Sequence, residues 1–194
     1  MADTRAFEDD APVATSKRGE RGDVESEALP GAKGDSLSGR SVTINRDRKE
    51  LYAFWRDFRN LPQFMDNVKA IEPIDGKRSH WVVLAPGERT VEWTSRITDD
   101  REGEVIAWTS EEDADVPNSG RIEFKDAGAR GTVVTATILY DPPAGVIGKL
   151  IAKMFQREPA IQARRDLRRF KQLMETGEVA TGARNRRLQE EGKN

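Results

Sequence analysis

The chain has 194 residues, with 34 aspartates and glutamates against 32 lysines and arginines, one histidine and no cysteine. This length allows one domain with tails, or at most two very small domains. Without cysteine there is neither a disulfide framework nor a zinc–thiolate site. The net charge of −2 creates no overall field that would attract nucleic acid or an anionic membrane.

The chain carries no recognisable membrane-spanning or secretory segment. No run approaches the ~20 apolar residues of a transmembrane helix, and the N-terminal residues lack the apolar block of a secretory signal. We therefore expect a cytoplasmic location, no integral membrane segment and no nucleic-acid partner. Peripheral contact with a membrane stays possible, and the sequence does not specify an oligomeric state.

The aromatic residues divide the chain into three regions. All four tryptophans, both tyrosines and six of the seven phenylalanines lie between Arg40 and Met174, so only this stretch can bury a sizeable core. The flanking regions are polar and show no hydrophobic period. We predict a disordered N-terminal arm over residues 1–39, a folded domain over 40–176 and a polar tail over 177–194.

The folded region begins with a strand and two short helices. Alternation of Val42 and Ile44 predicts a strand over 40–45. Asp47, with Glu50 three residues later, resembles a capping box. A helical pattern follows it, formed by Leu51, Phe54, Trp55 and Phe58. Asn60 and Pro62 predict the start of a second helix, with one apolar side formed by Leu61, Phe64, Met65 and Val68.

The next region reads as an antiparallel sheet covered by one helix. Short β-branched and aromatic runs between turn residues predict strands over 69–74, 78–85, 89–98, 104–110, 119–125 and 131–140. A final helix over about 146–174 covers one face, with a kink or break expected near 156–158 because Pro159 lies within it. Its other face is basic and solvated, and carries Arg164, Arg165, Arg168, Arg169 and Lys171 around a single acid, Asp166.

Strict alternation predicts which side chains share the inner face of the sheet. The inner set is Trp81, Val83, Val91, Trp93, Ser95, Ile97, Ile106, Trp108, Ser110, Ile122, Phe124, Val134, Ala136, Ile138 and Tyr140. These side chains either line a pocket or fill the core beneath the helix. Glu92, Arg96 and Glu123 point to solvent in the same phase.

The residues offer little for catalysis. His80 is the only histidine and faces outward, which disfavours a Ser-His-Asp system and a histidine metal site. The acidic run from Glu111 to Asp115 lacks calcium-loop spacing, and no glycine-rich loop is suited to a phosphate. We assign no catalytic residue, metal ligand or cofactor. Tyr140 either stabilises the core or meets a ligand, as a hydrogen-bond donor or a general acid.

Five stretches together resemble one known superfamily. They are SVTINRDRKELYAFWRDFRNLPQFM, RSHWVVLAPGERTVEWTSRI, EVIAWTS, the YDPPAG turn and FQREPAIQARRDLRRFKQLMETGE. The chain resembles the START-like (SRPBCC) superfamily, and within it polyketide cyclase/dehydrase-type proteins related to coenzyme Q-binding START-like proteins. The resemblance implies an α+β helix-grip fold: a curved antiparallel sheet with two short helices and a long C-terminal helix packed over an apolar cavity.

The resemblance leaves three functions open. The first is non-catalytic binding of a lipid, isoprenoid quinone or polyketide-like molecule in that cavity. The second is a cyclase/dehydrase of the aromatase type, and the third is a stress or interaction protein with a vestigial cavity. For the first, the predicted ligand-binding residues are Trp81, Trp93, Trp108, Phe124, Tyr140, Phe64 and Met154. We expect the mouth of the cavity to lie between the two short helices and the segment from Met154 to Pro159.

Overall fold

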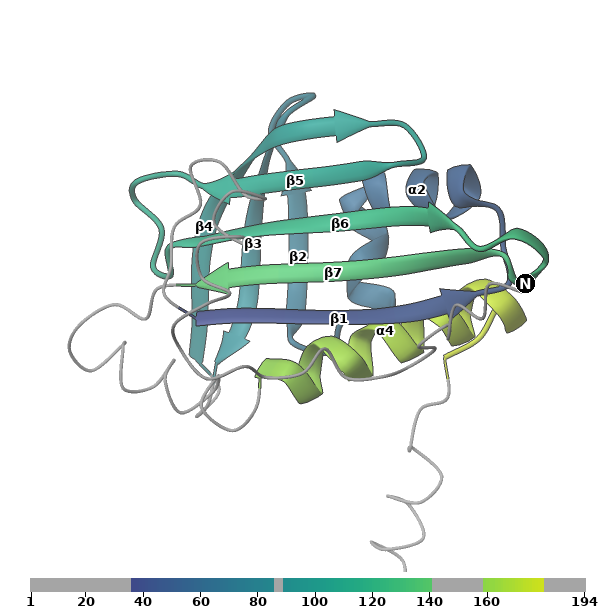
Figure 1. Cartoon of the computed structure of the whole chain (residues 1–194). Helices are drawn as coiled ribbons and strands as arrows, with labels where there is room; N and C mark the ends of the chain where they lie inside the picture. The colour runs from purple at the N-terminus through teal and green to yellow at the C-terminus, as the bar shows by residue number, and fades with distance from the viewer. Residues whose placement is uncertain (1–35, 86–88, 141–158, 180–194) are drawn as a thin grey trace, which may run out of the picture.

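The computed structural model describes residues 36–85, 89–140 and 159–179 (Figure 1). Its elements follow the predicted order. They are β1 (Ser36–Ile44), α2 (Arg48–Arg56), the 3-10 helix η1 (Phe58–Gln63), β2 (Val68–Pro73), β3 (Arg78–Ala85), β4 (Arg89–Arg101), β5 (Val105–Ser110), β6 (Asn118–Asp126), the 3-10 turn η2 (Gly128–Arg130), β7 (Thr132–Tyr140) and α4 (Pro159–Thr176).

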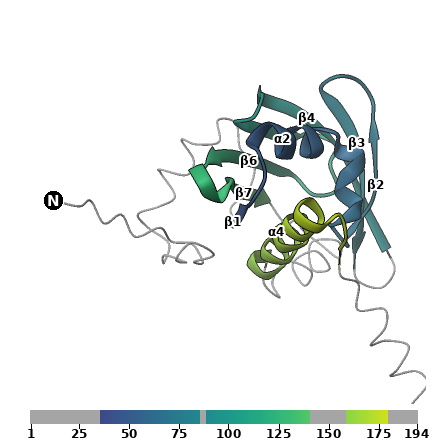
Figure 2. The same ribbon diagram turned by 90° about the vertical axis from the view of Figure 1, so that its right-hand side faces the viewer.

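The strands form one antiparallel sheet with the order β1-β7-β6-β5-β4-β3-β2. The sheet curls, and α4 lies across its concave side next to β1 (Figures 1 and 2). This arrangement confirms the helix-grip α+β fold. One boundary differs from the prediction: β1 begins at Ser36 and pairs with β7 from Ser36 opposite Tyr140. The predicted end of the arm at residue 39 therefore falls inside a strand.

The two short helices differ in type. Asp47 caps α2 as predicted, because its side chain accepts a hydrogen bond from the Lys49 N–H at 2.8 Å. The second helix is a 3-10 helix that begins at Phe58, not an α-helix that begins at Asn60. Pro62 lies inside it and has no N–H to donate, which favours a short, tight turn over a continued α-helix. Val68, predicted on this helix, is the first residue of β2.

The described part of α4 buries one side against the sheet. Leu167 and Phe170 are fully buried. The helix ends at Thr176, and the next residue, Gly177, has a positive φ of 78° and donates its N–H to the Leu173 carbonyl at 2.8 Å, as a C-terminal glycine cap does. The expected kink near 156–158 and the first half of the predicted helix lie outside the described residues. No helix in the described ranges is long and apolar enough to cross a membrane.

The core consists of a large cluster and a small one. At the centre of the large cluster the ring of Phe170 packs 4.9 Å from Trp55 and 5.0 Å from Phe64, measured between centroids. The small cluster contains Val83, Ala85, Val91 and Val116. Val68 and Trp93 pack against both clusters. Val68 and Trp93 therefore mark the boundary between the two clusters, and both residues line the cavity described below.

Candidate ligand site

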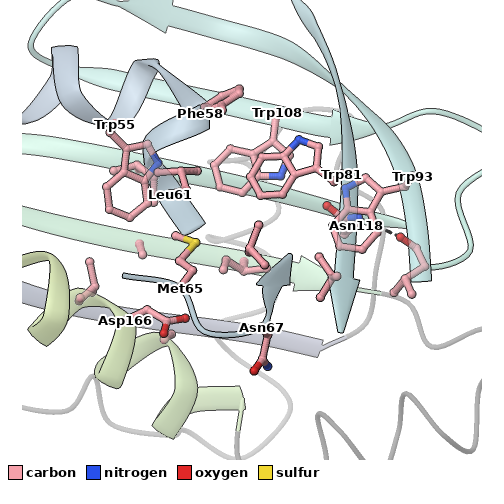
Figure 3. A pocket seen from close by; sticks show the side chains of 18 residues that line it. Trp55, Phe58, Leu61, Met65, Asn67, Trp81, Trp93, Trp108, Asn118 and Asp166 are labelled. Carbon is pink, nitrogen blue, oxygen red and sulfur yellow. Dashed lines mark hydrogen bonds between the residues drawn. The ribbon is translucent and has the colours of Figure 1, made fainter. Parts of the chain in front are cut away.

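A cavity of about 150 Å³ lies between the sheet, η1 and α4, where the two core clusters meet. Its wall is almost entirely apolar. The labelled apolar side chains in Figure 3 are Trp55, Phe58, Leu61, Met65, Trp81, Trp93 and Trp108. Among the described residues of the wall, the polar ones are Asn67, Asn118 and Asp166. A pocket with this lining is suited to an apolar guest that carries few polar atoms.

Two of the tryptophans form a fixed aromatic wall. Trp81 on β3 lies directly opposite Trp93 on β4, and their rings stack with an interplanar angle of 12° and centroids 6.1 Å apart. The Trp81 N–H donates to Ser79 Oγ at 2.8 Å, and the Trp93 N–H donates to Ser95 Oγ at 3.0 Å. Each serine is two residues from its tryptophan and so shares its face. Both indoles are thereby oriented without a ligand.

The third tryptophan of the sheet depends on a glycine. Trp108 on β5 lies opposite Gly120 on β6, and a Cβ atom at Gly120 would come within 2.1 Å of the Trp108 ring. The indole therefore lies flat against the backbone of β6, an approach that only glycine allows. Sequence reasoning identified the tryptophan and missed the glycine, although a glycine inside a predicted strand signals such an approach.

The predicted ligand-binding residues divide into three groups in the structure. Trp81, Trp93 and Trp108 come together on the cavity wall. Phe64 and Phe124 are 1% and 2% exposed and pack in the large core cluster, which is the core-filling alternative. Met154 and the side chain of Tyr140 lie outside the described residues. From the segment of the two short helices and the residues before β2, Phe58 and Met65 line the cavity, whereas Phe54 and Phe64 are not among the described lining residues.

Asp166 is the functional candidate that sequence reasoning missed. It was interpreted as the lone acid on the basic face of the helix, but it lines the cavity, and its carboxyl group points from α4 toward the apolar wall (Figure 3). The helical period contains the signal, since Asp166 lies three residues after Ala163 and four before the buried Phe170. A position with this spacing faces the sheet whatever its side chain, and Asp166 is partly buried there.

The environment of Asp166 disfavours its charged form. Burial, reinforced by the nearby charge of Asp66, raises the pKa of the Asp166 carboxyl to about 7, while Arg169 and Arg165 act in the opposite direction. Arg169 forms an ion pair with Asp66. This pair fastens the segment before β2 to α4 at the edge of the cavity. A carboxyl group that titrates near neutrality in an apolar pocket is a frequent mark of a functional site.

His80 lies where the alternation predicted. It is on the outer face of β3, and its Nε2 atom is 3.3 Å from Glu92 Oε2 on β4. His80 does not line the cavity. Within residues 36–85, 89–140 and 159–179, no cluster of three or more histidine, aspartate or glutamate side chains could hold a metal ion.

Comparison with known proteins identifies the family. The model of the family described as "Polyketide cyclase / dehydrase and lipid transport" matches residues 44–168. The chain belongs to this family. The match spans the two short helices, β2 to β7 and the part of α4 that carries Asp166, and it includes only the last residue of β1. No functionally curated protein matches the chain.

Solved structures agree with this assignment. A Deinococcus radiodurans protein is 39% identical, with a TM-score of 0.61 over 74% of this chain and 99% of its own. A Thermus thermophilus protein is 22% identical, with a TM-score of 0.59 over 71% and 95%. The Zhui aromatase/cyclase of a Streptomyces species is 16% identical, with a TM-score of 0.58 over 75% and 99%. The latter two likenesses concern the fold alone.

Proposed function

We propose that this protein binds an apolar small molecule in the cavity between η1, the sheet and α4. The observation that carries the proposal is a cavity of about 150 Å³ whose wall is aromatic and aliphatic. Apolar cavities of ~150 Å³ stay dry and take up a guest the size of benzene. The cavity therefore matches one ring, or the ring-sized part of a lipid, isoprenoid quinone or polyketide-like molecule.

The wall combines rigid and adaptable parts. The Trp81–Trp93 stack presents fixed aromatic surface, and burying such surface is the main source of affinity for an apolar guest. Met65 lines the cavity beside the Asp66–Arg169 ion pair and has an unbranched side chain that adapts to guests of different shape. A larger guest enters if the segment before β2 moves relative to α4.

We favour binding without catalysis because the described wall has one titratable side chain, Asp166, and no second acid or base converges with it. A cyclase/dehydrase is the second candidate. The likeness to the Zhui aromatase/cyclase and a carboxyl group whose pKa is about 7 support it, because such a group exchanges protons readily near neutral pH. Turnover of a poly-β-ketone that is lost in Asp166→Asn would favour this second candidate over simple binding.

The proposal is tested by titrating the protein with ethylbenzene and following tryptophan emission and the unfolding temperature. We expect saturable changes in both, with Trp93→Phe and Trp108→Phe altering the emission response because these indoles line the cavity. Ala163→Leu places extra carbons in the cavity and should weaken binding by roughly tenfold or more.

Two matched variants control for changes unrelated to the cavity. Ala53→Leu makes the same change at an exposed position of α2, and His80→Ala alters the outer face; neither should change ethylbenzene binding. Absence of saturable binding to the wild-type chain contradicts the proposal and favours the interaction protein with a vestigial cavity. Equal weakening by Ala163→Leu and Ala53→Leu would place the binding site elsewhere.

A further inference from the structure

The cavity wall contains two polar groups that have no hydrogen-bond partner in the described part of the chain. The indole N–H of Trp108 makes no hydrogen bond there, in contrast to those of Trp81 and Trp93, which donate to serines. The carboxyl group of Asp166 makes neither a hydrogen bond nor an ion pair with a described residue, and the nearby Arg169 is paired with Asp66. Trp108 and Asp166 are partly buried. A polar group without a partner in an apolar wall costs free energy, so a guest that pairs with it gains affinity.

The groups around Asp166 determine its state in an occupied cavity. From the segment before β2, Asp66 repels a second negative charge, and Arg165 and Arg169 on α4 itself oppose this effect. The residues that the sheet, α2 and η1 contribute to the described wall are uncharged. An apolar guest displaces water from the carboxyl group and removes hydration of its charged form, which favours the neutral acid. A neutral carboxyl group has an O–H to donate.

We propose that Asp166 is the specificity-determining residue of this cavity and that, as a neutral acid, it donates a hydrogen bond to a carbonyl oxygen of the guest. The inference rests on the proposed binding function and narrows it to neutral, ring-sized ketones and related carbonyl compounds. The unpaired N–H of Trp108 supplies a second donor in the same cavity. Both groups call for an acceptor on the guest.

The same environment rejects charged guests. A carboxylate guest would add a buried negative charge beside Asp66 and Asp166, and the guanidinium group of Arg169 is already held by Asp66. An ammonium guest would need the ionised form of Asp166 and the loss of its own hydration in an apolar cavity. Both require desolvation of a full charge, which costs more than one hydrogen bond returns.

Four one-ring probes of similar size test the proposal: ethylbenzene, acetophenone, benzoate and benzylammonium. In the wild-type chain at about pH 6, where the neutral acid dominates, we expect acetophenone to bind tightest and both ions to bind weakest. Asp166→Leu should reduce acetophenone affinity relative to ethylbenzene by roughly threefold to tenfold, which corresponds to one hydrogen bond. Asp166→Asn keeps a donor and should retain most of the preference for the ketone.

A second readout is the pH dependence of acetophenone binding. Affinity should fall between about pH 6 and pH 8.5 in the wild-type chain, because binding requires the protonated carboxyl group, and should stay constant in Asp166→Asn. A ketone preference that survives in Asp166→Leu, or tighter binding of benzoate or benzylammonium than of acetophenone, overturns this inference. Ethylbenzene separates the two proposals: if it binds and the ketone preference is absent, the binding function stands and only the role of Asp166 fails.

Discussion

Asp166 places a carboxyl group where a hydrophobic side chain would stabilise the fold better. The pKa of this carboxyl is raised from 3.8 to about 7 by burial first and by Asp66 second. A raised acid pKa means that the folded state binds the proton more tightly than the unfolded chain does. The ionised form therefore costs stability, and that cost grows as the pH rises from the unfolded value toward about 7.

The stability of Asp166→Asn should report this cost. Asparagine has nearly the same shape and no charge, so we expect a gain in the free energy of unfolding at about pH 8 of the order of 2 to 4 kcal/mol, and little change at about pH 4. Urea unfolding of the two chains at several pH values measures the difference. Asp113→Asn removes an exposed aspartate and should leave stability unchanged at both pH values. A change in the free energy of unfolding by Asp166→Asn that is the same at all pH values would contradict the raised pKa of Asp166.

For the strands, the two-residue alternation of side chains was sufficient to predict which side chains face the core and which face solvent. The alternation in β3 places Ser79, Trp81 and Val83 on the buried side and His80 outside, as observed. Alternation predicts the face of the sheet on which a side chain lies, but it does not predict whether that side chain lines the cavity or packs in the core. Whether an inward side chain reaches the cavity or the core depends on how the sheet curls over α4, so Trp93 and Phe124 could not be separated from the sequence.

Two features escaped prediction for different physical reasons. The register of β4 against β5 shifts between Ile97 and Asp99, a local irregularity that no residue pattern specifies. The importance of Gly120 comes from its contact with the Trp108 ring on the neighbouring strand. The partner of a strand glycine is known only once the register is known, because Trp108 is twelve residues away in sequence and directly opposite in space.

Gly120→Ala should expose this dependence. The added methyl group collides with the Trp108 ring, which must rotate into the cavity or force the strands apart. We expect a loss of roughly 1 to 3 kcal/mol in stability, although alanine is otherwise the better strand residue, together with weakened ethylbenzene binding and an altered near-ultraviolet circular dichroism spectrum. Gly39→Ala on β1 has room for its methyl group and serves as the control. Unchanged binding and spectra in Gly120→Ala would show that the ring adjusts freely.

At the scale of the whole molecule, α4 connects the two edges of the curled sheet. The strand order places β1 at one edge and β2 at the other. The helix packs along β1 (Figure 2). Arg169 pairs with Asp66 just before β2. Glu175 adds a bond from the end of α4, because it accepts from the Asn45 N–H at 2.7 Å. The folded domain must therefore include all residues that hold β1 in the sheet and α4 against it.

Truncation at two sets of boundaries tests where the folded domain ends. Residues Ser36–Gly39 pair with β7, Gly177 ends α4 with a hydrogen bond to Leu173, and Val179 packs against the large core cluster. A chain of residues 36–179 should therefore unfold cooperatively at nearly the temperature of the full chain and bind ethylbenzene equally well. A chain of residues 40–176 loses these contacts and should unfold roughly 5 °C lower or more. Thermal unfolding followed by circular dichroism measures both, and a loss of several degrees already in the 36–179 chain would show that a flanking region stabilises the domain.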